Sequence, residues 1–240
     1  MTPTPPRARP RLQAVADVVP RGSRVADIGS DHGRLPRLLV RGGHADWCIA
    51  TEYGDGPASR LRAGVAACAE ADRIEVRQGD GLDPLRPDDR IHGLVLSGMG
   101  GPTMLSILDA GRLRALGVTW LVLQPQSGWG GLRAGLEGRG WCVSKERLVR
   151  DRGRYYTIMR AGAGTALLQA PEGFNKSEWY ELGPCWFRDR DALALEYWAE
   201  RSSRARARLR RAHGEGVRHA RAAREFADRA LAALKSPRVG

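Results

Sequence analysis

The residues best suited to chemistry lie in one short run near the start of the chain, residues 25–33, which read VADIGSDHG. A β-branched, apolar stretch reaches Asp27, and a helical pattern over residues 35–40 begins just after the run. This order of strand, glycine turn and helix lets the backbone lie close to a cofactor, because Gly29 and Gly33 tolerate a positive φ. The carboxylate of Asp27 would repel a pyrophosphate. The run therefore favours an adenosine that carries a cationic sulfonium and an amino acid tail.

Carboxylates also follow the second and third apolar runs of the chain. Glu52 lies 25 residues after Asp27, where nucleotide-binding sheets place an acceptor for ribose hydroxyl groups. The alternative is a surface glutamate at the start of a loop. Asp80 stands between Gly79 and Gly81, so it either accepts a hydrogen bond from an adenine amino group or belongs to a simple turn.

Glycines and amides end the fourth and fifth apolar runs. Residues 98–101 read GMGG, and three glycines at a strand end indicate a backbone crowded by a flat or bulky group. Met99 would supply a soft apolar wall there. Gln124 and Pro125 end the fifth run at the same edge of the sheet. Their polar groups either read the edge of a base or cap the loop.

Strand-like and helical segments alternate through the first two thirds of the chain. The apolar runs span residues 24–28, 47–51, 74–78, 93–97 and 118–124, and the helical segments span residues 11–19, 57–71, 103–116 and 132–138. This alternation predicts right-handed crossovers and a parallel, doubly wound sheet. Residues 141–148 and 154–160 predict a closing antiparallel pair. The expected fold class is α/β, a Rossmann-like sheet of seven mostly parallel strands, as is typical of class I methyltransferases.

A second, smaller domain is expected after the glycines at 162 and 164. Residues 1–162 would form the sheet domain, with a flexible tail over residues 1–10, and residues 163–240 would form a basic helical domain. Residues 190–234 have long helical character, with an interruption predicted near residues 214–216. The pattern has no strict heptad seam, so a helical hairpin is favoured over an extended coiled coil.

The positive charge of the chain is concentrated at its end. Of a net charge of +12, the segment from residue 200 to residue 240 carries +8, from twelve Lys or Arg and four Asp or Glu residues. Such a segment favours a polyanionic partner, through counterion release and electrostatic steering. The alternative is a helix that merely displays its charge to water. Arg204, Arg208 and Arg211 are the candidate contacts to a nucleic acid.

Cysteine usage and the lack of long apolar runs indicate the compartment in which the protein functions. The four cysteines are scattered without a Cys-x-x-Cys pair, which argues against a zinc site and a disulfide framework and suits a reducing cytoplasm. The sequence has no apolar run long enough to span a bilayer, and its proline-rich start lacks the apolar core of a secretion signal. We therefore expect a cytoplasmic protein with neither a metal nor a membrane partner.

Taken together, these motifs resemble a known family. From residue 11 to residue 160 the chain is similar to the TrmK-type bacterial tRNA (adenine-22-N1) methyltransferases. The resemblance rests on Arg11-Leu12, Val19-Pro20, residues 27–33 with Leu35-Pro36, Glu52, Gly81-Leu82, Gly98-Met99-Gly100-Gly101, residues 121–125 and Tyr155-Tyr156. The C-terminal part is similar to the helical extension of that family. Arg34, where the family often has an aromatic residue, and the richness of the tail in arginine are departures.

The resemblance implies transfer of a methyl group from S-adenosylmethionine to N1 of an adenine in the D-arm region of tRNA, by a monomer. The residues implied to bind the cofactor are Asp27, Gly29, Ser30, Asp31, His32, Gly33, Glu52, Tyr53, Asp80, Gly81, Gly98 and Met99. The residues implied to bind the substrate are Gly100, Gly101, Gln124, Pro125, Arg204, Arg208 and Arg211.

Two roles remain open for Asp31. It either stabilises the positive charge that develops on the target adenine, as a catalytic carboxylate, or binds the ammonium group of the cofactor. His32 would orient Asp31, contact the base or be structural. Two other functions also remain open for the chain as a whole. One is methylation of another RNA adenine or a small metabolite, and the other is RNA binding without turnover.

Overall fold

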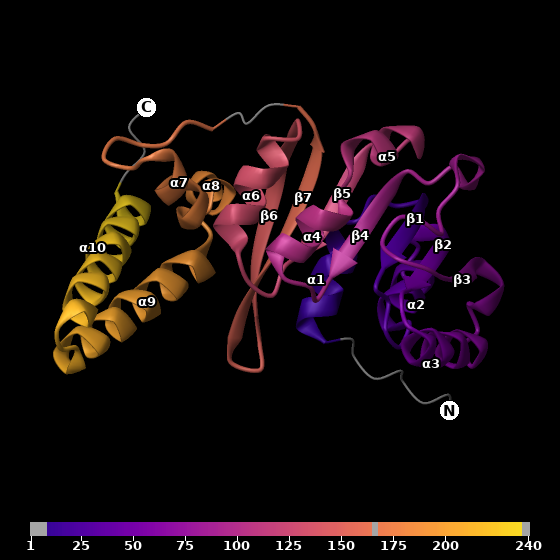
Figure 1. Cartoon of the computed structure of the whole chain (residues 1–240), viewed down its shortest axis with the longest axis horizontal. Coiled ribbons are helices and arrows are strands. Elements are labelled where there is room, and N and C mark those ends of the chain that lie inside the picture. The colour runs from indigo at the N-terminus through magenta and orange to yellow at the C-terminus, as the bar shows by residue number, and fades with distance from the viewer. Residues whose placement is uncertain (1–8, 165–167, 237–240) are drawn as a thin grey trace. The chain divides into compact units, whose positions relative to one another are not determined.

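The computed structural model describes residues 9–164 and 168–236, and the chain divides into two compact units, residues 1–167 and 168–240 (Figure 1). Most of the expected N-terminal tail, residues 1–8, lies outside the described part. Helix α1 already begins at Pro10 (Pro10–Val18), where proline is favourable because its missing N–H has no acceptor in the first turn.

The first unit is built on one seven-stranded sheet, which confirms the predicted fold class. Its strands are β1 (Ser23–Ile28), β2 (Ala45–Glu52), β3 (Ile74–Gln78), β4 (Gly93–Ser97), β5 (Trp120–Gln124), β6 (Trp141–Asp151) and β7 (Arg154–Ala163). Their order across the sheet is β3-β2-β1-β4-β5-β7-β6. Strands β1 to β5 are parallel, and β7 runs antiparallel to β5 and β6. From β1, strands β2 and β3 are added on one side of the sheet, and β4 and β5 are added on the other. β1 and β4 therefore flank the topological switch point, at which such sheets bind ligands.

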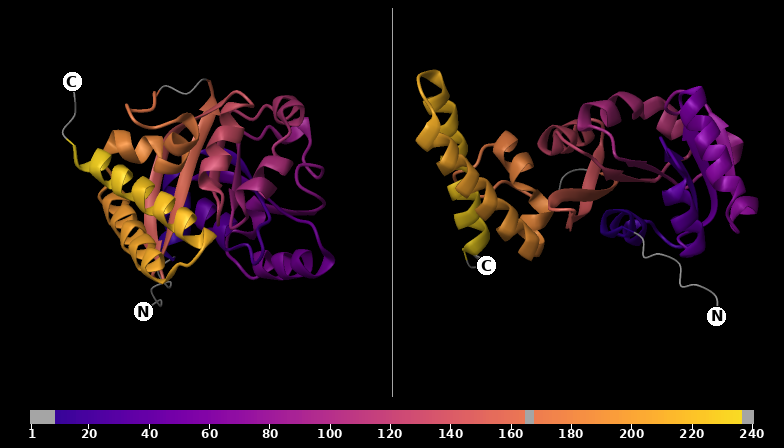
Figure 2. Two further views of the ribbon diagram at one scale, coloured as in Figure 1. Left: turned by 60° about the vertical axis from the view of Figure 1, so that its left-hand side comes forward. Right: turned by 90° about the horizontal axis from the view of Figure 1, so that it is seen from below.

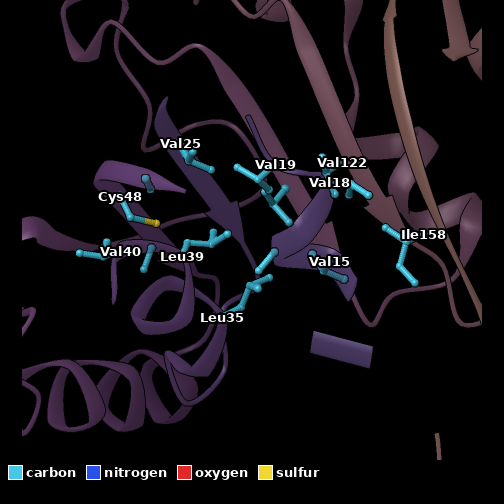
Figure 3. Close-up of a cluster of buried hydrophobic side chains, with 14 of the residues drawn as sticks. Val15, Val18, Val19, Val25, Leu35, Leu39, Val40, Cys48, Val122 and Ile158 are labelled. Carbon is cyan, nitrogen blue, oxygen red and sulfur yellow. The ribbon is translucent and has the colours of Figure 1, made fainter. Parts of the chain in front are cut away.

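Helices cover both faces of this sheet (Figures 1 and 2). Besides α1, they are α2 (Arg34–Arg41), α3 (Asp55–Ala66), α4 (Gly101–Ile107), α5 (Ala110–Ala115) and α6 (Trp129–Glu137), with short 3₁₀ turns at Ala71–Arg73 and Pro87–Asp89. Neighbouring strand residues point to opposite faces, so Val122 enters one apolar cluster while Leu121 and Leu123 enter the other. The first cluster joins α1, α2 and the sheet through side chains such as Val15 and Leu39 (Figure 3).

The bounds of several elements in this unit differ from the predicted ones: the helix expected over residues 57–71 ends at Ala66, the strand expected over residues 118–124 begins at Trp120, and β7 continues to Ala163. The single helix expected over residues 103–116 is two helices, because Asp109 caps α5 by accepting a hydrogen bond of 2.7 Å from the Arg112 amide. Strand β6 continues beyond the expected residue 148 to Asp151, where a two-residue turn of Arg152 and Gly153 leads into β7.

The second unit contains four helices in its described part, α7 (Lys176–Leu182), α8 (Pro184–Asp189), α9 (Ala192–Arg211) and α10 (Glu215–Lys235). Helices α9 and α10 lie side by side as a hairpin (Figures 1 and 2), and the break between them, residues 212–214, begins two residues before the interruption predicted near residues 214–216. The aromatic rings of Trp198 on α9 and Phe226 on α10 pack edge to face, with centroids 5.2 Å apart.

The core of this second unit consists of a few large indole rings and several small side chains. Leu193, Tyr197 and Leu209 are only half-buried, whereas Trp186 and Trp198 have no exposed surface. The buried positions of α10 are mostly alanines, namely Ala220, Ala227 and Ala230. Small side chains let two helices approach closely, and the large indole rings fill the space that remains.

Candidate active site

A cavity of about 440 Å³ opens at the carboxyl ends of β1 and β4, in the first unit. Its lining comes from five regions of the chain: α1 and the residue before it, the turn from β1 to α2, the end of β2, the loop after β4 and the loop after β5. The lining residues are Arg9, Arg11, Leu12, Asp27, Gly29, Ser30, Asp31, His32, Arg34, Leu35, Glu52, Ser97, Gly98, Met99 and Gln126. Its volume falls within the usual range for small-molecule sites.

Hydrogen bonds to β1 and β2 fix the turn that forms the floor of this cavity. The Oγ of Ser30 donates to Asp27 Oδ2 at 2.7 Å, and the Asp27 side chain is almost fully buried. The backbone N–H groups of Gly29 and Ser30 both donate to the Thr51 carbonyl at 3.0 Å. These bonds hold the turn in one conformation.

The Asp27 carboxyl group is held partly neutral by its surroundings. Burial is the largest influence and raises its pKa from 3.8 to about 7, although the hydrogen bond from Ser30 works in the opposite direction. The nearby charge of Glu52 raises the pKa further. A positively charged ligand in the cavity would favour the ionised form and lower this pKa.

Glu52 and Asp31 meet at the entrance of the turn. The Asp31 amide donates to Glu52 Oε1 at 2.5 Å, and Asp31 adopts φ of 52°, a conformation that aspartate tolerates better than most residues. Its carboxylate is 64% exposed and lies 3.6 Å from Nε2 of His32. The Asp31 backbone amide therefore holds the Glu52 side chain in place, while the Asp31 carboxylate stays available to a ligand.

The loop after β4 closes the cavity from the other side of the switch point. Gly29 has φ of +74°, and a Cβ atom there would lie 2.3 Å from Met99 Cε, so only glycine allows Met99 to sit against the turn. The Gln126 amide donates to the Met99 carbonyl at 2.7 Å, which ties the loops after β4 and β5 together.

The other predicted cofactor residues lie outside the lining of this cavity. Tyr53 is 72% exposed, and Asp80 is exposed in the turn after β3. The Gly79 amide, next to Asp80, donates to the Glu52 carbonyl at 2.9 Å, so this turn borders the end of β2. Gly33 is buried at the start of α2, and Gly81 has φ of +47°.

The predicted substrate residues near β4 and β5 are placed by packing. A Cβ on Gly101 would lie 2.7 Å from the Gly128 carbonyl oxygen, which explains the glycine, whereas Gly100 has more open surroundings. Gln124 is fully buried, and its side-chain NH₂ group donates to the Pro125 carbonyl at 3.0 Å. Its side-chain oxygen accepts hydrogen bonds from Ser97 and from Arg11. The structure therefore directs the Gln124 side chain into the loop and not into the cavity.

Five polar lining residues were not among the predicted site residues: Arg9, Arg11, Arg34, Ser97 and Gln126. Arg11 is the best connected of them, because it also lies over the Tyr156 ring, 5.3 Å from its centroid. The sequence did contain a signal for two of these residues. Arg11 belongs to a motif that carries the family resemblance, and Arg34 is a departure from that family.

The predicted arginines of the second unit share one face of α9. Arg204, Arg208 and Arg211 line a cleft of about 500 Å³ together with Ala207, Ala212 and Gly216. Arg204 pairs with Glu200 at 3.0 Å, four residues earlier on the helix. Within the described part of the chain, Arg208 and Arg211 form no ion pair, so both charges remain available to an anion.

The described residues contain neither a cluster of metal ligands nor a helix that could span a membrane. Within residues 9–164 and 168–236, no three His, Cys, Asp or Glu side chains gather as metal ligands. Across the same residues, no helix has the length and apolar character required to cross a membrane.

The strand order and the acidic glycine turn at the switch point define a Rossmann-like methyltransferase. In agreement, the family described as "Methyltransferase domain" matches residues 8–159. The tRNA (adenine(22)-N(1))-methyltransferase of Bacillus subtilis (strain 168) is 33% identical over 190 residues, which cover 79% of each chain. The chain belongs to this methyltransferase family, as its motifs had indicated.

Solved structures agree with this assignment. The Bacillus subtilis m1A22 tRNA methyltransferase TrmK superimposes with a TM-score of 0.77 at 27% identity, covering 94% of this chain and 99% of that one. A proposed tRNA (m1A22) methyltransferase from Streptococcus pneumoniae, solved in complex with S-adenosyl-L-methionine, gives a TM-score of 0.80 at 27% identity, covering 92% and 98%.

Proposed function

We propose that this protein transfers a methyl group from S-adenosylmethionine to N1 of adenine 22 in tRNA. The observation that carries the proposal is the cavity at the switch point, where Asp27, Asp31 and Glu52 meet beside Gly29 and Met99. The relatives named for this activity support the same acceptor.

The cavity is lined by both acidic and basic side chains, which suits a cofactor that carries both positively and negatively charged groups. Asp27, Asp31 and Glu52 suit a sulfonium and an ammonium group, and Glu52 also suits ribose hydroxyl groups. The guanidinium groups of Arg9, Arg11 and Arg34 lie in the same lining and suit the carboxylate of the amino acid tail. S-adenosylmethionine supplies an electrophilic methyl group carried on sulfur.

The acceptor needs little activation by the protein. Adenine N1 has a free lone pair at neutral pH, so no general base has to remove a proton before attack. The protein mainly has to hold N1 within about 3 Å of the methyl carbon, in line with the sulfur. Positive charge then develops on the base, and a carboxylate that accepts from its amino group would stabilise that charge.

Asp31 is the proposed carboxylate in one of two roles, which a single substitution separates. If Asp31 contacts the target adenine, Asp31→Asn lowers kcat while the Kd for the cofactor stays within about threefold of the wild type. If it binds the cofactor ammonium group instead, the same substitution raises that Kd by about tenfold or more, because a charged hydrogen bond is lost.

Recognition of the tRNA requires an unpaired target. N1 lies on the Watson–Crick edge, which is hidden in a duplex, so adenine 22 must be unpaired or swung out to reach the cavity. In this proposal the arginines of α9 bind phosphates and set the position of the tRNA, while residues of the cavity contact the target base and select it.

The decisive experiment identifies the product. Purified protein is incubated with labelled cofactor and unmodified tRNA, and the digested nucleosides are analysed by mass. We expect 1-methyladenosine, at position 22 only. A transcript with another base at position 22 is the matched control and should remain unlabelled. Labelled guanosine or uridine, or an equally labelled control transcript, would overturn the proposal.

A further inference from the structure

The β6–β7 hairpin reaches beyond the sheet on the side of the active site. The last pair between β5 and β7 is Leu123 with Met159, whereas β7 stays paired with β6 as far as Arg154 and Asp151. Because β5 ends at Gln124, the rest of the hairpin projects past the carboxyl ends of the parallel strands (Figure 1). We call this projection, residues 147–158, the ribbon.

The ribbon is attached to the helix that lines the cavity. Arg147 pairs with Asp17 of α1 at 2.9 Å, and the Tyr156 ring lies against the guanidinium of Arg11, which itself lines the cavity. Val149 and Ile158 bury their side chains in the apolar cluster with α1. The base of the ribbon is therefore held rigidly beside the cavity.

The outer half of the ribbon is basic and exposed. Arg150, Arg152 and Arg154 are exposed, and Asp151 is the one acidic residue of the ribbon. Within the described part of the chain, neither Arg152 nor Arg154 forms an ion pair. Side chains alternate along a strand, so Arg154 shares the face of Tyr156 and Ile158 that turns toward α1. At about 3.3 Å per residue, the Asp151–Arg154 pair lies about 7 Å beyond Tyr156, and Arg152 in the turn lies about 10 Å beyond it.

The turn itself carries an arginine where backbone geometry favours another residue. Arg152 and Gly153 have φ of 50° and 73°, and two positive φ values in a two-residue hairpin favour Asn-Gly or Asp-Gly. An arginine in this position is an unusual choice for a turn, and it places a guanidinium group at the tip of the projection.

We propose that the ribbon binds the phosphate backbone of the RNA next to the target nucleotide. This inference rests on the proposed function, because it assumes that the polyanion entering the cavity is tRNA. Arg152 and Arg154 would contact consecutive phosphates. Contacts to phosphate fix the register of the strand without reading sequence.

The test removes two charges without disturbing the turn. In the Arg152→Asn/Arg154→Gln variant, asparagine is favoured at the first turn position, so the melting temperature should not fall. The matched control is Arg73→Gln/Arg114→Gln, which removes two exposed arginines next to the amino ends of β3 and β5, at the opposite edge of the sheet. Both variants should bind S-adenosylhomocysteine as the wild type does in calorimetry.

The readouts are tRNA affinity by filter binding over a range of salt concentrations, together with kcat and KM for methylation. We expect the ribbon variant to bind tRNA about 3- to 30-fold more weakly and to raise KM similarly, with kcat unchanged. Its slope of log K against log salt should fall by about 1.4–1.8, since each phosphate contact contributes about 0.7–0.9. The control should match the wild type in slope.

The inference is overturned if the ribbon variant and the control show the same tRNA affinity and the same salt slope. If the wild type forms 1-methyladenosine in that case, the proposed function still stands. If the wild type forms no 1-methyladenosine but the ribbon variant alone loses RNA affinity and slope, the proposed function fails and the ribbon remains an RNA-binding surface.

Discussion

The two units of this protein place charged side chains in opposite ways. In the first unit, Asp27, Glu52 and Met99 come from distant parts of the chain and meet because parallel strands end at one edge. Backbone and side-chain bonds then fix them, as the 2.5 Å bond from the Asp31 amide to Glu52 illustrates. In the second unit, Arg204, Arg208 and Arg211 come from one helix and share a face because of its period.

The difference matches the roles proposed for the two units. Methyl transfer depends on alignment within fractions of an ångström, which a buried and hydrogen-bonded site provides. Attraction of a polyanion depends on the number of charges and tolerates mobile side chains. Substitutions in the first unit should therefore affect cofactor and turnover strongly, and substitutions in the second should affect tRNA binding moderately.

The largest effect is expected from Glu52→Ala. It removes a proposed acceptor for ribose and frees the Asp31 amide, so the Kd for S-adenosylhomocysteine should rise by about 100-fold in calorimetry, with methylation lost in parallel. Glu52→Gln keeps an oxygen for the amide and should show a loss of about tenfold. If the Kd of the Glu52→Ala variant for S-adenosylhomocysteine stays within about threefold of the wild-type value, Glu52 does not contact the cofactor.

A pH dependence should follow from the raised pKa of Asp27. If the cationic ligand binds the ionised form, its affinity should rise about tenfold between pH 6 and pH 8, because Asp27 titrates at about 7. Binding near pH 7 should release a proton, which calorimetry in buffers of different ionisation enthalpy detects. An Asp27→Asn variant whose cofactor affinity keeps the same pH dependence would contradict this assignment.

The same pKa has a consequence for the ligand-free protein. The unfolded carboxyl group loses its proton near pH 4, but the folded one keeps it until about pH 7. The contribution of Asp27 to stability is therefore present at low pH and falls as pH rises through this window. Denaturant unfolding at pH 4.5 and pH 7.5 should show this decline in the wild type and a smaller one in Asp27→Asn.

A smaller effect, on KM for tRNA, is expected from the double substitution Arg208→Gln/Arg211→Gln. Loss of two unpaired charges should raise KM for tRNA by about 3- to 10-fold and leave the cofactor Kd unchanged. The Arg73→Gln/Arg114→Gln variant again serves as the control. An unchanged KM for tRNA would show that Arg208 and Arg211 do not contribute to tRNA binding.

The smallest effect, confined to stability, is expected from Ser202→Ala. The Ser202 hydroxyl donates to Asp228 Oδ1 at 2.5 Å between α9 and α10, and this bond is the main reason that the pKa of Asp228 lies below its usual range. Its loss should cost about 1 kcal/mol of the free energy of unfolding. The neighbouring, exposed Ser203→Ala is the matched control, and both variants should methylate normally.

Much of this architecture could be predicted because its signals are local. The alternation of apolar runs and helical segments predicted the sheet, and the glycine turn with its carboxylates marked the edge at which the cavity opens. The break in the basic helices was also visible, as glycines at 214 and 216 interrupt the pattern. The capping of α5 by Asp109 was missed, because a cap of this kind resembles any polar residue on an exposed helix face.

Contacts between distant segments could not be predicted. The hydrogen bond from Arg11 to Gln124 could not be predicted, because the two residues lie 113 positions apart in the chain. This bond occupies the side-chain oxygen of Gln124, which was one candidate for contact with a base. Likewise, nothing in the run 98–101 shows that Met99 would pack against Gly29. Such contacts depend on which elements pack against each other.

The sequence by itself determined the elements, the order of the acidic side chains along them and the concentration of arginine at the end of the chain. These features follow from periodicity, from glycine conformations and from composition, each of which acts over a few residues. Tertiary structure decided which side chains line the cavity, how Asp27 acquires its raised pKa and where the ribbon points. The reason is physical: burial, desolvation and strand register arise only when segments that are far apart in the chain come together.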